Sequence, residues 1–421
     1  MLRDKESSYE WDRHGEPVLY AIQEAASISD EVAQKVLDIL EDRHADFESA
    51  QMGEECEFDS DSRYEWKSAR DHEFAFEWHA IERSLKSQSR FFNQGAEAFL
   101  LRLFDNLDGR LTRDGLAVVV AAGPDTAHTS FFRARVFHKS DELDEAMIRP
   151  DLHVGPPPER FARAGRMNAN GIAVFYGASD KGVALAEVRP PVGSRALVAE
   201  FRLLRPLRLL DVTALQSVYV EGSVFDPHYF EQLSLAKFMG RLSDRITMPV
   251  MPDDEPTEYL ITQMIADYLA RKPSPSLDGI LFRSVQSPGE HVNVVLFHHA
   301  SRVELLEIPE GTELSARQYD TTEDGDEPNY RVWEEVPPAP EKIEEQEDDL
   351  GLFAMLDTPR FDPNEDFREV ALRVMTETVS AHHVSGVTFA TDDFEVSRHR
   401  MEKREWKFAK TASIDLGDLE I

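Results

Sequence analysis

The residues best suited to chemistry lie between positions 131 and 210, where arginine dominates a locally positive stretch. This stretch contains 11 Arg and 2 Lys against 9 Asp and Glu, a net charge of +4, whereas the whole 421-residue chain carries −34. A guanidinium group can bind two phosphate oxygens at once, which an ammonium group does not do. An arginine-rich patch in an acidic protein therefore favours a small anionic ligand over a long polyanion such as nucleic acid.

Two of these arginines and one glutamate stand out by their sequence context. Arg133 lies in the apolar run FFRAR, so a β-strand would direct its guanidinium into a cleft or core, where it needs an anionic partner. Arg166 lies in AGRMNANG, whose Gly and Asn residues permit tight turns close to a ligand. Glu187 is the only acid in the segment KGVALAEV, for which we predict a helix capped by Asp180 or Ser179. It is either an exposed surface residue, which composition alone favours, or a functional acid.

The elements that would carry these residues are short strands mixed with a few helices. Short strands and helices in mixed order indicate an α+β or α/β domain, which we place at residues 115–312, and we assign the chain to the α+β class. The expected strands are the β-rich runs at 116–123, 131–137, 172–177, 196–204, 207–212, 279–284 and 292–299, with helices at 180–188 and 258–270.

Residues 1–114 show helical patterns and no strand signal. Apolar residues recur on one helical face in three stretches, so we predict a small N-terminal helical domain. The apolar positions are Val32, Val36, Ile39 and Leu40, then Phe74, Trp78, Ile81 and Leu85, then Phe92, Ala96, Phe99, Leu100 and Leu103.

The C-terminal quarter begins with a strongly acidic stretch. Residues 323–349 contain 12 acidic and 2 basic residues with VPPAP between them, a composition that resists collapse, so we predict an extended linker over residues 313–350. For residues 351–421 we predict a small α/β extension, with a helix in EDFREVALRVMTETV and strands in GVTFA and FEVSRHRM.

Several kinds of site are excluded by the sequence. Cys56 is the only cysteine, so there is no intramolecular disulfide and no cysteine-only zinc site. The segment GASDKGV has phosphate-loop spacing, but Val183 stands where the lysine must be. The histidine pairs lack metal-ligand spacing, so no metal is expected. There is no apolar leader segment and no run close to 18 apolar residues, so we expect a soluble, cytoplasmic protein.

Five segments in chain order resemble the motifs of the RES domain, a family named for an Arg, a Glu and a Ser. The segments are FFRAR, GRMNANGIAVFYGAS, ALAEVRPPVGSR, GILFRSVQSPG and VNVVLF, and they span about Phe131 to Phe297. The resemblance implies a fold similar to that of ADP-ribosyltransferases and, as in characterised members, a toxin that degrades NAD. The helical stretch before it is similar to the HEPN/RES N-terminal domain of longer members.

The resemblance also assigns roles to six residues of this chain. The catalytic residues would be Arg133, Glu187 and Ser284, and the residues that bind NAD would be Arg166, Tyr176 and Asn293. The arginines would hold the pyrophosphate, and Glu187 would stabilise the positive charge that develops on the ribose when its bond to nicotinamide breaks. Tyr176 would offer an aromatic face or a hydroxyl, and Ser284 would orient the substrate rather than attack it.

We therefore expect an NAD phosphorylase or glycohydrolase, with inorganic phosphate as co-substrate in the first case. Two alternatives remain open: an ADP-ribosyltransferase that modifies a protein, and a non-catalytic interaction or regulatory protein with a relict NAD pocket. Stand-alone toxins of the family pair with an antitoxin, so an antitoxin or regulatory protein is a candidate partner. Neither nucleic acid nor a membrane is expected as a partner.

Overall fold

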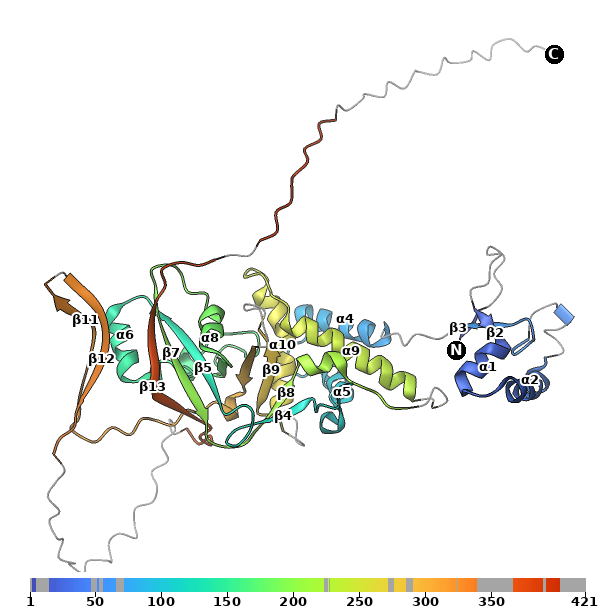
Figure 1. Ribbon diagram of the computed structural model, residues 1–421, viewed down its shortest axis with the longest axis horizontal. Helices are drawn as coiled ribbons and strands as arrows, with labels where there is room; N and C mark the ends of the chain where they lie inside the picture. Colours follow the sequence, from blue (N-terminus) through green and yellow to red (C-terminus); the bar gives the residue numbers. More distant parts are fainter. Residues whose placement is uncertain are drawn as a thin grey trace, which may run out of the picture.

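The computed structural model describes residues 2–4, 15–46, 51–52, 56–65, 72–222, 226, 228–271, 276–284, 291–323, 325–338, 366–388 and 391–401. This part of the chain combines helices with a large mixed sheet, which confirms the predicted α+β class (Figure 1). None of the helices described in it is long and apolar enough to cross a membrane.

The large sheet has eight strands in the described residues, in the order β13-β7-β5-β6-β10-β9-β8-β4. Neighbouring strands are antiparallel except β8 and β9, which are parallel. The strands are β4 (Val119–Ala122), β5 (Ser130–Phe137), β6 (Phe175–Ala178), β7 (Arg195–Leu203), β8 (Leu207–Asp211), β9 (Gly279–Arg283), β10 (Val292–Leu296) and β13 (Leu372–His383).

The sheet is almost divided between β5 and β6. These two strands are joined by one Cα pair, Phe132 with Ala178, whereas β5 pairs with β7 along its whole length. Strands β13, β7 and β5 therefore form one lobe of the sheet, and the other five strands form the second lobe. Phe132 on β5 and Ala178 on β6 therefore mark the boundary between the two lobes.

Helices cover both faces of the sheet. One face packs against α6 (Ser140–Ile148) through a core that includes Phe131, Phe175 and Phe201, with α7 (Pro150–His153) following α6. The other face carries α8 (Lys181–Glu187) over β5 and β7, and α9 (Tyr229–Thr247) and α10 (Glu255–Arg271) over the second lobe. Short 3₁₀ helices connect these elements at Leu107–Gly109, Glu159–Phe161, Thr213–Ser217 and His298–Ala300.

Helices α4 (His72–Ser87) and α5 (Gln94–Leu103) belong to the same core as α9 and α10. The rings of Trp78, Phe99 and Phe238 pack with centroids 5.6–5.8 Å apart, and Phe238 lies on α9. The sequence identified the buried faces of both helices, although Phe92 is 99% exposed. A domain boundary at residue 114 does not fit this packing, because the buried faces of α4 and α5 are covered by helices from the middle of the chain.

Residues 2–65 contain a small α/β unit where only helices were predicted. Strands β1 (Leu2–Asp4), β3 (Arg63–Glu65) and β2 (Glu16–Pro17) form a sheet beside α1 (Val18–Ala26) and α2 (Asp30–His44). The strands are two or three residues long, which is too short to produce an alternating pattern. The buried face of α2 also differs from the prediction: Ala33 and Leu37 are buried, whereas Val32 and Ile39 are exposed.

Part of the predicted acidic linker is a β-hairpin, formed by β11 (Glu313–Thr322) and β12 (Gly325–Glu335). The hairpin is attached through Gln318, which is 6% exposed and whose amide donates hydrogen bonds to Ser140 O and Asp144 Oδ1, both at 2.8 Å. The prediction of a linker is wrong for residues 313–335, because these specific contacts outweigh the acidic composition. Residues 339–350 of the predicted linker lie outside the described residues.

The predicted C-terminal helix is wrong. Within that segment the chain forms β13, which pairs with β7 at the edge of the large sheet. Leu372 and Val374 are buried and are separated by a polar residue, as on one face of a strand. The apolar residues that suggested a helical face are therefore buried on one face of a strand instead. The expected strands GVTFA and FEVSRHRM are not strands in residues 386–388 and 391–401, and residues 389–390 lie outside the described part. The predicted separate α/β extension is therefore replaced by one strand of the main sheet.

Candidate active site

The carboxylate of Glu187 is held by two buried side chains of the second lobe. Ser284 Oγ donates a hydrogen bond to Glu187 Oε1 at 3.0 Å, and Asn293 Nδ2 donates to the same oxygen at 2.7 Å. Ser284 and Asn293 are each 5% exposed, whereas Glu187 is exposed. One carboxylate oxygen is therefore fixed, while Oε2 accepts no hydrogen bond from the described residues and remains available to a ligand.

The helix α8 places Glu187 beside these donors. Asp180 caps the helix, as predicted, because its Oδ1 accepts hydrogen bonds from Gly182 N at 2.7 Å and Val183 N at 3.2 Å. Val183 is buried against the first lobe of the sheet, and the helix ends at Glu187 before Pro190. The short helix thus fixes the position of the carboxylate at its last turn.

Tyr176 lies on the same face of the sheet as Asn293. In the pairing of β6 with β10, Ala178 is opposite Asn293 and Tyr176 is opposite Val295. Tyr176 and Asn293 are therefore diagonal neighbours, with Cα atoms roughly 7–8 Å apart. Asn293 is hydrogen-bonded to Glu187, and Tyr176 is hydrogen-bonded to the turn at residues 165–168.

The hydroxyl of Tyr176 fixes the turn at residues 165–168. It donates a hydrogen bond to Asn168 Oδ1 at 2.8 Å and accepts one from Met167 N at 3.0 Å. A Cβ atom at Gly165 would lie 2.7 Å from this hydroxyl, so only glycine permits such a close approach. Burial raises the pKa of Tyr176 to about 12, so the phenol stays neutral and keeps its proton at physiological pH.

Arg166 projects from this turn toward α9 and α10. Its Nη1 donates to Ile246 O at 2.6 Å, and its guanidinium carbon lies 5.7 Å from the centre of the Tyr259 ring. The main-chain oxygen of Arg166 accepts a hydrogen bond from the hydroxyl of Thr262. None of the described carboxylates forms an ion pair with Arg166, so its charge is available to an anionic ligand.

Arg133 lies on the opposite face of the sheet from Glu187. Its neighbour Phe132 packs on the side of α8, and side chains alternate along a strand, so Arg133 points the other way. Its guanidinium carbon is 5.5 Å from the centre of the Phe175 ring, and its Nη1 donates to Tyr176 O at 3.0 Å, across the division between β5 and β6. Its buried Nε has no hydrogen-bond partner among the described residues.

Burial lowers the pKa of Arg133 to about 10, with a smaller contribution in the same direction from the nearby charge of Arg135 and an opposing one from Tyr176. The guanidinium nevertheless remains protonated at neutral pH. A buried cation without a described carboxylate partner is held here by an aromatic ring and a carbonyl oxygen.

The structure therefore brings only part of the expected set together. Glu187, Ser284 and Asn293 meet at one carboxylate oxygen, and Tyr176 and the turn that carries Arg166 lie on the same face of the sheet. Arg133 makes no described contact with Glu187.

Sequence reasoning missed Asn168, Tyr259 and Thr262, which hold Tyr176 and Arg166 in place. Asn168 was visible only as a turn residue. The two residues of α10 gave no signal, because they lie more than 90 positions from Arg166 and within an ordinary amphipathic helix. No group of three His, Cys, Asp or Glu in the described part is arranged to hold a metal ion.

Taken together, fold and site define an α+β protein with an exposed carboxylate held beside the division of a two-lobed sheet. Residues 132–319 match the family model of the RES domain, so this part of the chain is a RES domain. No curated protein matches the chain. The helices before residue 132 are not covered by the family match. A RES domain is consistent with an enzyme that acts on NAD.

Proposed function

We propose that this protein cleaves the bond between nicotinamide and ribose in NAD. The observation that carries the proposal is the carboxylate of Glu187, whose Oε1 is fixed by Ser284 and Asn293 while Oε2 is open. Breaking the bond at C1′ produces positive, oxocarbenium-like charge on the ribose, as in glycoside hydrolysis. A carboxylate oxygen that is oriented before the reaction stabilises this charge without further reorganisation.

The electrons of the broken bond pass to the nicotinamide ring, which leaves as a neutral molecule. The departure of this group therefore requires no general acid. Phosphate or water then forms the new bond to C1′, and an attacking water gives its proton to a base, a role that Glu187 Oε2 can take. The products are nicotinamide and either ADP-ribose 1-phosphate or ADP-ribose.

The charges on this face of the sheet support a substrate with phosphate groups. Arg166 has no described carboxylate partner, and a charge-assisted hydrogen bond to a phosphate contributes roughly 1.5–3 kcal/mol. We assign Arg133 a different role from the expected one. Because it lies on the other face and donates to Tyr176 O, it holds β6, and with it Tyr176, in position.

The test measures nicotinamide release from NAD by the full chain, with and without phosphate. We expect release by the wild type and a loss of roughly 100-fold or more in Glu187→Gln, which keeps the shape of the side chain but removes its charge. Ser284→Ala and Asn293→Ala each remove one donor and should lower the rate less. The matched control is Glu145→Gln, an exposed glutamate on α6 at the other face, which should leave the rate unchanged.

The product identifies the acceptor. Formation of ADP-ribose 1-phosphate only when phosphate is present indicates phosphorolysis, and free ADP-ribose indicates hydrolysis. Labelling of a macromolecule by NAD would instead indicate an ADP-ribosyltransferase. The proposal fails if the wild type releases no nicotinamide with any of these acceptors.

A further inference from the structure

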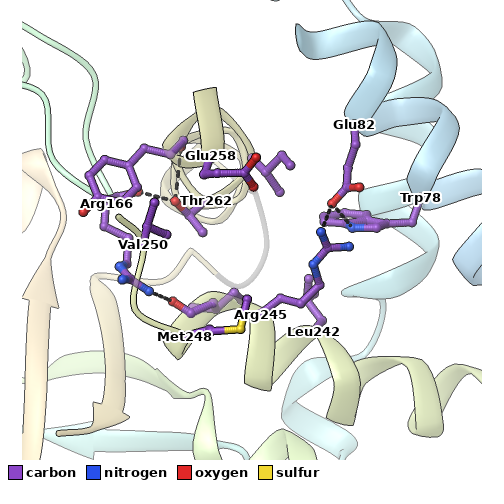
Figure 2. Close-up of a pocket in the computed structure, with 12 residues that line it drawn as sticks. Trp78, Glu82, Arg166, Leu242, Arg245, Met248, Val250, Glu258 and Thr262 are labelled. Carbon is purple, nitrogen blue, oxygen red and sulfur yellow. Dashed lines mark hydrogen bonds and ion pairs between the residues drawn. The ribbon is translucent and has the colours of Figure 1, made fainter. Parts of the chain in front are cut away.

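The cavity between α4, α9 and α10 is nearly filled by its own side chains (Figure 2). Its volume is about 50 Å³, room for a few water molecules rather than for a ligand. Figure 2 shows Glu82 joined to Trp78 and Arg245. On the opposite side, Arg166 donates to the carbonyl oxygen of Ile246. A larger space for a ligand lies elsewhere, at one end of the first lobe of the sheet.

A cavity of about 260 Å³ lies where β5 ends and β7 begins. It is lined by Phe137 and His138 at the end of β5 and by residues 191–195, which lead into β7. A Cβ atom at Gly193 would meet no atom within 4 Å, which agrees with open space beside this loop. Pockets for drug-sized ligands begin at roughly 300 Å³, so this cavity suits a smaller molecule.

Basic side chains gather around this cavity. His138 and Arg195 line it, and the pairing of β13 with β7 places His383 directly opposite Arg195. Side chains that are directly opposite in antiparallel strands lie on the same face of the sheet. None of the described carboxylates forms an ion pair with any of these three residues. Basic groups without an acidic partner therefore meet at this end of the sheet, in a chain whose net charge is −34.

The described partner of the Arg195 side chain is a neutral amide. Arg195 Nη1 donates to Gln318 Oε1, and Gln318 Nε2 donates to Asp144 Oδ1 at 2.8 Å. The amide is thus bonded to both groups and takes the place of a direct ion pair between them. A guanidinium has five N–H donors, so Arg195 retains donors for a ligand. Glu142, another acid of α6, is paired with Lys139.

We propose that this cavity binds a phosphate group, either inorganic phosphate or the phosphate of a small monoester. The planar fork of Arg195 fits two phosphate oxygens, and the imidazole of His138 supplies a further donor from the neighbouring strand. The site is separate from the carboxylate site, because none of the residues that line it is hydrogen-bonded to Glu187 in the described part of the chain. It does not depend on the proposed reaction.

Calorimetric titration of the full chain with inorganic phosphate and with glycerol 3-phosphate tests the site. We expect the wild type to bind at least one of them with a Kd of about 1 mM or lower. His138→Ala and Arg195→Gln should each weaken this binding roughly tenfold or more, and Arg195→Lys should weaken it too, because an ammonium group lacks the fork. The matched control is Arg189→Gln, which removes an exposed arginine of the same loop that does not line the cavity and should keep the wild-type affinity.

Two further variants separate this site from the one around Glu187, where phosphate has a place as co-substrate. Arg166→Gln and Glu187→Gln should leave the measured affinity unchanged. Tighter binding of glycerol 3-phosphate would identify a monoester as the ligand, and equal or tighter binding of inorganic phosphate would identify the free ion.

The inference is overturned if the wild type binds neither compound, or if Arg189→Gln loses as much affinity as Arg195→Gln. It is also overturned if Arg166→Gln abolishes a binding event that His138→Ala and Arg195→Gln retain. If Arg195→Gln does not fold without its bond to Gln318, His138→Ala decides the outcome, because His138 is exposed.

Discussion

The hydroxyl groups of two half-buried tyrosines differ in whether they have partners. Tyr176 O–H donates to Asn168 Oδ1 and accepts from Met167 N, whereas the buried hydroxyl of Tyr268 has no hydrogen-bond partner among the described residues. Removal of the Tyr176 hydroxyl would leave Asn168 Oδ1 and Met167 N without this partner, whereas removal of the Tyr268 hydroxyl would break no described hydrogen bond. The contribution of Tyr176 therefore extends beyond its ring to the turn that carries Arg166.

We predict that Tyr176→Phe lowers the free energy of unfolding by about 1–3 kcal/mol, because a buried N–H and a buried amide oxygen lose their partner. The KM for NAD should rise as well, since the turn at residues 165–168 loses an anchor. Urea unfolding measures the first effect, and nicotinamide release measures the second.

The control for this prediction is Tyr268→Phe, which removes a hydroxyl without a described partner. Its stability should equal or exceed that of the wild type, and its KM should not change. Equal losses in both variants would show that the hydrogen bonds of Tyr176 contribute nothing specific.

Single residues also show where sequence reasoning reached its limit. Glu187 was identifiable as the lone acid of an apolar helix, while Ser284 and Asn293 were assigned only through the family resemblance. For Arg133 the strand was predicted correctly, yet the sequence did not reveal which face it points to. The alternation of a strand predicts that the side chains of Phe132 and Arg133 point to opposite faces of the sheet. It does not predict which face carries α8 and Glu187.

At the scale of elements, β13 completes the large sheet from a distant part of the sequence. It lies beyond the residues that match the RES family, yet it pairs with β7 and buries Leu372 fully. Its sequence was interpreted as a helix because its apolar residues suit either period. The strands β5, β7, β8, β9 and β10 were predicted because each is a compact β-rich run. Whether this segment forms a helix or a strand depends on the edge of β7, with which it pairs, and that edge is created only by the tertiary fold.

We predict that Leu372→Ala lowers the free energy of unfolding of the domain that contains the large sheet by about 2–5 kcal/mol, because it leaves a cavity in the core beneath β7. Thermal or urea unfolding measures this effect. Val387→Ala is the control, since Val387 is 50% exposed, and its stability should stay within about 0.5 kcal/mol of the wild type. Similar stability of the two variants would mean that β13 is not part of the cooperative fold.

At the scale of the whole molecule, the N-terminal helices and the RES domain share one core. The rings of Trp78 and Phe99 pack on Phe238, and the same core continues to the sheet through Val295. A chain divided into independent units would not show such packing. Helices that lie outside the family match therefore belong to the core on which the sheet of the RES domain packs.

We predict that Phe99→Ala destabilises the RES domain by about 3–5 kcal/mol, although residue 99 lies more than 30 positions before that domain. Unfolding followed by fluorescence and loss of nicotinamide release on heating should show one common transition. Phe92→Ala removes a ring that is 99% exposed and should change neither. Two separate transitions in Phe99→Ala would argue for independent domains.

The division of the sheet has a consequence for local opening. Helix α8 packs on the first lobe, while Ser284 and Asn293 belong to the second, so the two hydrogen bonds to Glu187 join lobes that share a single backbone pair. Units of a protein with few shared backbone bonds separate at lower free energy than the whole unfolds. Amide hydrogens along this boundary should exchange with solvent before those inside either lobe, and a ligand that contacts both lobes should slow their exchange.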